Sequence, residues 1–297
     1  MNAEYDVASA AHAIGVLMHE TLEGGDQGDV LHLSDVQTSA YDACAVEDPR
    51  SYRLTHRNSA DFFEAAFRVR GVICQRNLPP VLEIRPSVPG HRLRQSVTLT
   101  ALGDHIIFDK YLATIRQFHD LFKASFPGEK FVLDCFYTYE GHRCLILFNR
   151  YLSFRADTPN TRQIAFDPQI DPAGVLRRHP YQNMHHVEDN RVMYSRRELL
   201  DGVQSLKNIS PTSFKNGDLI EVHFSFVAFP AKKGEPRRIA CVMHHLILLN
   251  DRIRKESEGG THSSPLHPIT VRSLKRKHVV TDVNGMNGKD GKEMRMD

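Results

Sequence analysis

The sequence predicts an α+β fold built mainly of antiparallel β-strands, with one central packed helix. Between residues 68 and 149, short runs either alternate apolar with polar side chains or are rich in Val and Ile, as strands with a buried face do. One segment of this region instead repeats apolar residues every three to four positions, which indicates an amphipathic helix. The overall content of 41% apolar and 25% charged residues is that of a globular protein.

Three strands are expected before the helix. Arg68–Gln75 is rich in Val and Ile, Val81–Arg85 follows a Pro-Pro pair, and Arg92–Ala101 alternates apolar and polar residues. The helix begins after Asp104, whose side chain suits an N-cap, and ends before a Pro-Gly pair.

Two strands, Phe131–Tyr139 and His142–Asn149, follow the helix and are joined by a tight turn. The order strand, strand, strand, helix, strand, strand is that of an OB-like barrel, a fold that binds oligonucleotides or oligosaccharides. A mixed antiparallel sheet with one packed helix has the same order. Leu219–Phe229 and Ile239–Leu248 alternate strongly and predict an additional central β-hairpin.

The charge distribution divides the chain into three parts. Residues 1–49 contain ten acidic side chains and no Lys or Arg, and Ser9–Leu22 has helical spacing, so this part is expected to be an acidic N-terminal arm with a helix. Residues 50–250 form the mainly β globular domain. Residues 251–297 are polar and predict a disordered basic tail. The arm is either a solvated leader or a segment that folds over a basic face and competes with a polyanion.

The cysteines and the lack of long apolar runs predict an intracellular protein, cytoplasmic or nuclear. The five cysteines are odd in number and include no CxxC, which favours reduced thiols. No run approaches the roughly 18 residues that span a bilayer, and no basic signal-peptide region is present, so no membrane partner is expected. The basic cluster near Lys275–Lys277 is either an import signal or an ordinary solvated run.

Arginines that share strand faces suggest binding to a polyanion. Arg contacts phosphate and stacks on bases, and Tyr or Phe offers a stacking platform. A solvated basic face is the alternative interpretation. The candidate nucleic-acid-binding residues are Arg68 and Arg70 on one strand, Arg92 and Arg94 on another, and the pair Arg177 and Arg178.

Histidines and carboxylates ahead of a predicted strand suggest a metal site instead. His186 and Glu188 are two residues apart, so both side chains point the same way from an extended backbone. Imidazole and carboxylate are ligands for zinc or non-haem iron, and a distal His would complete the set. Histidines bonded to backbone or water are the alternative. The candidate metal ligands are His185, His186, Glu188, His223 and His245.

The predicted hairpin offers a second constellation. If Phe229 faces Arg237, five polar side chains share one face, where they could bind metal or form a nucleophile–base pair. A one-residue slip would scatter them, and an ordinary polar sheet face is the alternative. The five are Glu221, His223, Ser225, Cys241 and His245.

Part of the chain, about Tyr181–Asp251, resembles a group of uncharacterised proteins from mushroom-forming fungi. The resemblance implies no activity, cofactor or site residue. The matching motifs are His186-Val187-Glu188-Asp189-Asn190-Arg191-Val192, Phe214-Lys215-Asn216-Gly217-Asp218-Leu219-Ile220-Glu221-Val222, Ser225-Phe226-Val227-Ala228-Phe229-Pro230 and Leu246-Ile247-Leu248-Leu249-Asn250-Asp251.

The sequence therefore favours a binding module over an enzyme. It has no GxGxxG after a strand, Walker loop, GxSxG elbow or HExxH, so the common dehydrogenase, NTPase and hydrolase classes lose support. We expect a module for single-stranded nucleic acid or another polyanion. The alternatives are a metal-dependent enzyme with a His/carboxylate site and a protein-interaction scaffold that binds a partner through an exposed sheet edge.

Overall fold

The computed structural model describes residues 5–23, 30–57, 63–85, 87–103, 105–178, 181–200, 203–232 and 234–259, all within one unit, Met1–Gly260. Three predicted features lie outside these residues: the N-cap Asp104, the basic cluster at Lys275–Lys277 and the tail beyond residue 259. None of the described helices is long and apolar enough to cross a membrane.

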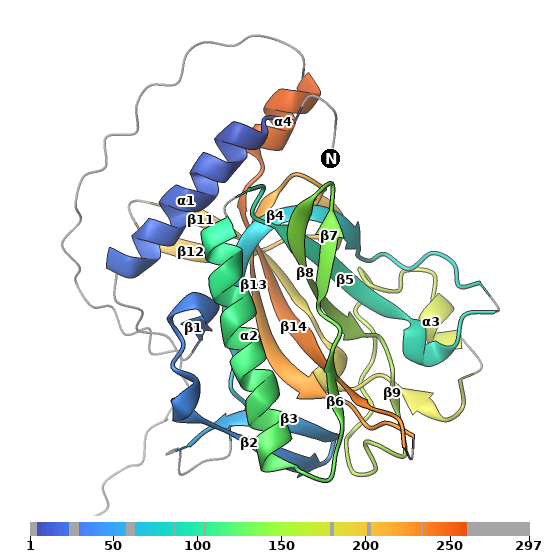
Figure 1. Ribbon diagram of the computed structural model, residues 1–297. Coiled ribbons are helices and arrows are strands. Elements are labelled where there is room, and N and C mark those ends of the chain that lie inside the picture. Colours follow the sequence, from blue (N-terminus) through green and yellow to red (C-terminus); the bar gives the residue numbers. More distant parts are fainter. Residues whose placement is uncertain are drawn as a thin grey trace, which may run out of the picture. The chain divides into compact units, whose positions relative to one another are not determined.

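Five strands close into a barrel (Figure 1). They are β4 (Phe67–Asn77), β5 (Arg94–Thr100), β8 (His142–Arg150), β13 (Leu219–Ala228) and β14 (Arg237–Asn250). β4, β5 and β8 form an antiparallel meander. β14 runs parallel to β8 and antiparallel to β13, and β13 closes the ring beside β4. This OB-like arrangement confirms the predicted fold class, but the expected additional hairpin is two strands of the barrel itself.

Two predicted strands differ from the structure. Val81–Arg85 is irregular, and the Val81 N–H donates to the Ile170 carbonyl instead of a neighbouring strand. It therefore belongs to the β4–β5 connection, as does the short 3₁₀ helix η3 (Gly90–Arg92). The predicted strand after the helix divides into β6 (Phe131–Leu133) beside β14 and β7 (Phe136–Tyr139) beside β8.

The central helix α2 (His105–Ser125) packs its apolar stripe on the barrel. The Phe118 ring lies 5.1 Å from the Phe67 ring of β4 and 5.2 Å from the Phe226 ring of β13, measured between centroids. Burial of such aromatic side chains is a main source of core stability. The amphipathic spacing in the sequence thus identified the face of α2 that meets the sheet.

The acidic N-terminal part contributes to the same core. It holds α1 (Val7–Glu23), β1 (Leu31–His32) and β2 (Tyr41–Glu47). The expected boundary between residues 49 and 50 falls in the turn between β2 and β3 (Arg50–His56), which pair along their whole length. Several buried residues of this part lie in the main cluster, among them Ile14, Leu33 and Tyr41.

A small second core organises the long segment between β8 and β11. The segment carries β9 (Ser153–Phe154), α3 (Val175–Arg178), β10 (Met184–His185) and the 3₁₀ helix η4 (Glu188–Asn190). Gly90 of the β4–β5 connection lies so close that an added Cβ would be 2.7 Å from the Met184 sulfur and 2.9 Å from the Tyr181 ring. The segment therefore supports this connection beside the end of the barrel (Figure 1).

The remaining elements extend one end of the sheet. β11 (Met193–Leu200) runs parallel to β14 and pairs with the edge strand β12 (Val203–Asn208), and α4 (Arg252–Gly259) follows β14. Two exposed leucines, Leu199 and Leu206, lie on this edge hairpin.

Candidate nucleic-acid interface

Two arginines face each other where β5 begins and β8 ends. Arg94 is directly opposite Arg150 in the antiparallel register, so both side chains lie on the outer face of the barrel. The inner face at these strands is apolar core, including Val97 and Leu147. Like charges directly opposite each other in an antiparallel pair destabilise the sheet. The outer face thus holds a concentration of positive charge that the fold does not require.

Each guanidinium of this pair stacks on a phenylalanine ring. The Arg94 guanidinium carbon lies 4.7 Å from the centroid of Phe148, and that of Arg150 lies 3.6 Å from the centroid of Phe229. Both rings are half-buried and pack on a small outer cluster around Val227. Stacking orients the guanidinium planes while leaving their N–H edges open to an acceptor.

Within the described part of the chain the Arg94–Arg150 pair makes no direct ion pair, although Asp157 and Asp189 act on Arg150 from farther away. Neither side chain has a carboxylate within ion-pair distance there, whereas Arg53 of β3, which pairs with β13, bonds to Glu64 and Asp189. Burial lowers the pKa of Arg150 to about 10; Asp157 opposes that shift and Arg94 adds to it. Arg150 is therefore a partly desolvated cation that a bound anion would stabilise.

Two connections add further cations at this end of the barrel. Burial lowers the pKa of His91 in η3, and the charges of Arg150, Arg92 and Lys232 lower it further. Lys232 belongs to the β13–β14 connection and is exposed. The His91 ring stacks on Phe154 at 6.1 Å between centroids. The β4–β5 connection leads directly into Arg94, and the β13–β14 connection begins at Phe229, on which Arg150 stacks, so both connections border the arginine pair.

The six predicted arginines are divided among three places. Arg92 and Arg94 belong to the cluster just described. Arg68 and Arg70 instead lie beside buried Glu221, at 3.7 Å and 2.7 Å from its carboxylate, and are not directed toward the cluster. Arg177 and Arg178 are exposed on α3, and the Arg178 side chain donates to the carbonyls of the two residues that precede this helix.

Sequence reasoning did not select Arg150, Phe148, Phe229 or Lys232. Phe148 and Arg150 alternate with buried residues at the end of β8, which is the signal that could have placed them on an outer face. The facing of Arg94 and Arg150, however, depends on a strand register that the sequence does not specify.

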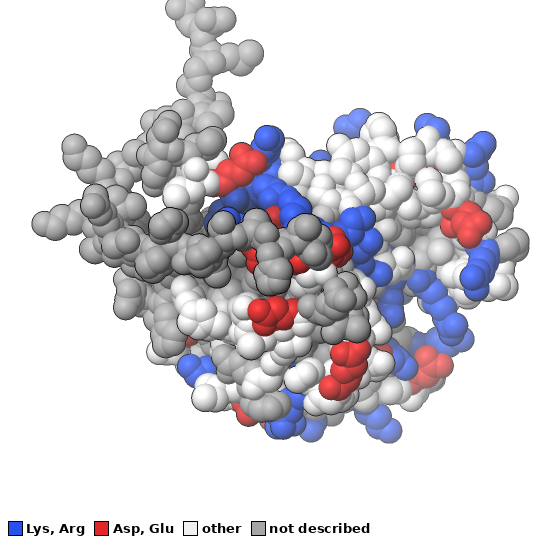
Figure 2. Space-filling model, turned by 90° about the horizontal axis from the view of Figure 1, so that it is seen from above, with Lys and Arg blue, Asp and Glu red and all other residues white. Residues whose placement is uncertain are grey.

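Surface charge alone does not reveal this site. On the face seen from above, basic and acidic side chains lie among one another where the residues are described (Figure 2). What distinguishes the Arg94–Arg150 pair is that the two side chains face each other across the strands and that each stacks on a phenylalanine ring, and not the local density of arginine.

The predicted metal ligands His185, His186 and Glu188 do not converge. His185 lies 2.5 Å from the Thr158 hydroxyl through Nε2, and the His186 Nδ1–H donates to the Tyr151 carbonyl at 2.8 Å. Glu188 is exposed and pairs with Arg191. The predicted orientation of His186 and Glu188 fails because Glu188 begins the 3₁₀ helix η4, where the backbone is no longer extended.

The other two predicted ligands, His223 and His245, do lie side by side on the hairpin, with ring centroids 5.6 Å apart. His223 bonds to Glu221 at 3.0 Å, and His245 bonds to the Ser195 hydroxyl at 2.9 Å. Burial lowers the pKa of His245 to about 4. Within the described residues, no three His, Cys, Asp or Glu side chains are placed to hold a metal ion.

The register assumed for the hairpin was wrong. Phe226 faces Cys241, and a bulge between His223 and Phe224 shifts the pairing so that His223 faces His245. Cys241 therefore lies in the core, and His244 takes the position near Ser225, 3.1 Å from its hydroxyl. Ser225 is buried, so this Ser–His pair is closed to a substrate.

No family model and no curated protein matches the chain. Among solved structures, the crystal structure of gp2.5, a single-stranded DNA-binding protein encoded by bacteriophage T7, is similar at a TM-score of 0.33 and 9% sequence identity. The similarity covers 63% of this chain and 92% of that chain.

Proposed function

We propose that the protein is a binding module for single-stranded nucleic acid, and that Arg94, Arg150 and the two bordering connections form its phosphate-binding surface. The observation that carries the proposal is the facing pair of stacked arginines. Among the described residues, no carboxylate lies within ion-pair distance of either one. A phosphate between them would accept hydrogen bonds from both guanidinium groups and remove the repulsion between them.

The location within the barrel supports the same proposal. OB-folds bind oligonucleotides on the face of their second and third strands and with the loops that join strands one to two and four to five. In this chain those elements are β5, β8 and the connections that carry Arg92 and Lys232. The cations occur at all of these elements.

Exposed aromatic surface favours a single strand over a duplex, because only unpaired bases can stack on a side chain. Phe148 is half-buried on the outer face of β8 and carries the Arg94 guanidinium on its ring, so a base would stack beside this pair. Tyr137 of β7 faces Cys144 and is 48% exposed, so it lies farther along the same outer face. The strand from Cys144 to Arg150 is about 20 Å long, at roughly 3.3 Å per residue, and its outer face is buried at Cys144 and half-buried at Phe148 and Arg150.

The direct test is binding of a fluorescein-labelled oligothymidylate, followed by anisotropy at low salt. The double variant Arg94→Ala/Arg150→Ala should bind at least about tenfold more weakly, because two charge-assisted contacts are lost. Lys110→Ala/Arg116→Ala removes the same charge from exposed positions of α2 and should bind like the unmodified protein. Equal losses in both variants, or no binding by the unmodified protein, would refute the proposed function.

A further inference from the structure

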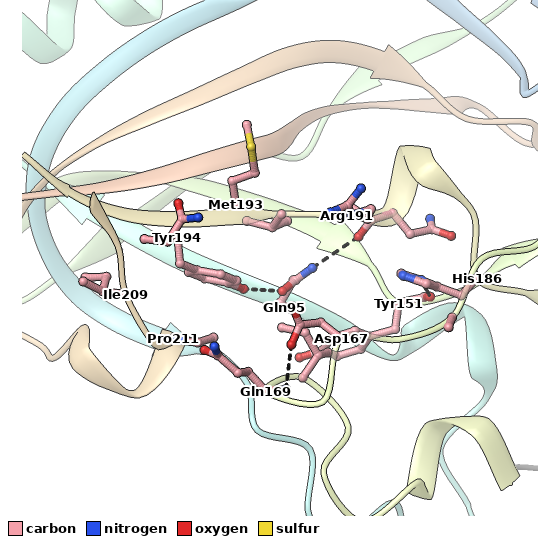
Figure 3. Close-up of a pocket in the computed structure, with 15 residues that line it drawn as sticks. Gln95, Tyr151, Asp167, Gln169, His186, Arg191, Met193, Tyr194, Ile209 and Pro211 are labelled. Atoms are coloured by element: carbon pink, nitrogen blue, oxygen red, sulfur yellow. Dashed lines mark hydrogen bonds between the residues drawn. The ribbon is translucent and has the colours of Figure 1, made fainter. Parts of the chain in front are cut away.

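A polar cavity of about 250 Å³ lies next to the strand ends that carry the arginine pair. Gln95 and Tyr151, each next in sequence to one of the two arginines, line it together with Tyr194 of β11 (Figure 3). Gln95 is buried and points away from Arg94, because successive strand residues alternate between faces. The cavity is therefore separate from the phosphate-binding surface but close to it.

Hydrogen-bonding groups are already oriented around this cavity. The Tyr194 hydroxyl donates to Gln95 Oε1, and Gln95 Nε2 reaches the Asn190 carbonyl only at 3.4 Å, a long contact that a better acceptor can replace (Figure 3). His186 donates its Nδ1–H to the Tyr151 carbonyl, so its Nε2 is an acceptor. Burial lowers the pKa of His186, which keeps the ring neutral.

The charged side chains that line the cavity are already bonded. Asp167 accepts the Gln169 N–H at 2.7 Å, and Arg191 pairs with Glu188 at 2.7 Å. Because the Asp167 carboxylate keeps its charge beside the cavity, a neutral ligand suits the cavity better than an anion. Its volume is below the roughly 300 to 1,000 Å³ of sites for drug-sized ligands, so it has room for one ring system.

We infer that this cavity binds a nucleobase, a neutral planar ring with donor and acceptor atoms along its edge. His186 Nε2 accepts a hydrogen bond from the ring, and the Gln95 amide and Tyr194 hydroxyl supply the complementary groups. The base is either part of a free nucleoside or part of a bound strand, and the inference rests on the proposed function only in the second case.

The test is calorimetric titration of the full chain with adenosine, guanosine, cytidine and uridine, which carry no phosphate. At least one should bind with a Kd below about 1 mM. Tyr194→Phe should weaken that binding about tenfold through the loss of one hydrogen bond. His186→Phe, which keeps the ring stacked 4.1 Å from Phe166, should also weaken it. Lys110→Ala/Arg116→Ala, at exposed positions of α2 that do not line the cavity, should leave nucleoside binding unchanged.

Absence of nucleoside binding, or equal binding by folded Tyr194→Phe and His186→Phe variants, would overturn the inference. Competition between the nucleoside and the labelled oligonucleotide would show that the base comes from the bound strand, and simultaneous binding would show a separate nucleoside site. Either result supports the inference that the cavity binds a nucleobase. Nucleoside binding without any oligonucleotide binding would refute the proposed function and leave this inference standing.

Discussion

Replacing Glu221 with Gln should destabilise the fold strongly, because this one carboxylate neutralises several cations inside the protein. Its side chain is 1% exposed. Arg70 lies 2.7 Å from it, Arg197 lies 3.0 Å from it, and Arg68 lies 3.7 Å from it. The neighbouring imidazole of His223 lies at 3.0 Å. These groups hold the pKa of Glu221 far below its usual range against the opposing effect of burial.

The magnitude follows from the loss of the negative charge in a buried ion-pair network. Removing one partner of such a pair costs about 3 to 5 kcal/mol, because the opposite charge stays behind in a poorly solvated place. Glu221→Gln keeps the side-chain volume, so the cost is electrostatic and not a cavity effect. At about 2 to 4 °C per kcal/mol for a domain of this size, the melting temperature should fall by about 6 to 20 °C.

Urea denaturation and thermal melting measure this effect directly. Glu188→Gln is the matched control, since Glu188 also pairs with an arginine but is exposed, and an exposed pair contributes less than about 1 kcal/mol. A loss below about 1 kcal/mol for Glu221→Gln would refute the reasoning. It would also weaken the assignment of Arg68 and Arg70 to the interior network instead of a nucleic-acid surface.

Three further outcomes follow from the same structure. Phe148→Ala should weaken oligonucleotide binding about 2- to 5-fold, the equivalent of about 0.5 to 1 kcal/mol, because Arg94 loses the ring that orients its guanidinium; anisotropy measures this. Gly90→Ala should lower the free energy of unfolding by about 1 to 3 kcal/mol, because its Cβ would meet the Met184 sulfur at 2.7 Å; urea denaturation measures this. Burial lowers the pKa values of His244 and His245 to about 4. Histidines of the unfolded chain bind protons below about pH 6.5, whereas the buried ones do so only near pH 4. The free energy of unfolding should therefore be highest above about pH 6.5 and fall toward pH 4 by up to about 1.4 kcal/mol per histidine per pH unit. Unfolding curves that do not change over this range would contradict the burial of these two histidines.

The sequence was sufficient for the elements whose apolar pattern reflects one buried face. The stripe of α2 and the alternation in β13 identified those elements and their core sides. The hairpin pairing could not be predicted, because a bulge at His223/Phe224 changes the register and moves Cys241 into the core. Strand order alone likewise could not show that this hairpin closes the barrel.

The candidate site was predictable in part for a similar reason. Arg68, Arg70, Arg92 and Arg94 look alike in the sequence, since each lies on a strand face or next to one. Glu221 is 151 residues from Arg70 along the chain, and only the fold brings the two together. Arg150 meets Arg94 through a register between strands separated by α2. Local sequence patterns therefore identified Arg94 but not Arg150. They also could not distinguish Arg94 from Arg68 and Arg70, which stabilise the interior.

The predictions that stay open concern other parts of the chain. The basic cluster near Lys275–Lys277 lies outside the described residues, and the resemblance of Tyr181–Asp251 to fungal proteins remains a prediction. A protein partner at the sheet edge is also still a prediction, with the exposed Leu199 and Leu206 as the place to examine.

The most direct test of the central claim is the salt dependence of oligonucleotide binding in the unmodified protein and in Arg94→Ala/Arg150→Ala. For single strands, the logarithm of the binding constant falls with the logarithm of salt concentration by about 0.7 per phosphate contact. Loss of two contacts should therefore make the slope shallower by about 1.4, while Lys110→Ala/Arg116→Ala keeps the original slope. The same slope in all three proteins would contradict the claim that the arginine pair contacts phosphate.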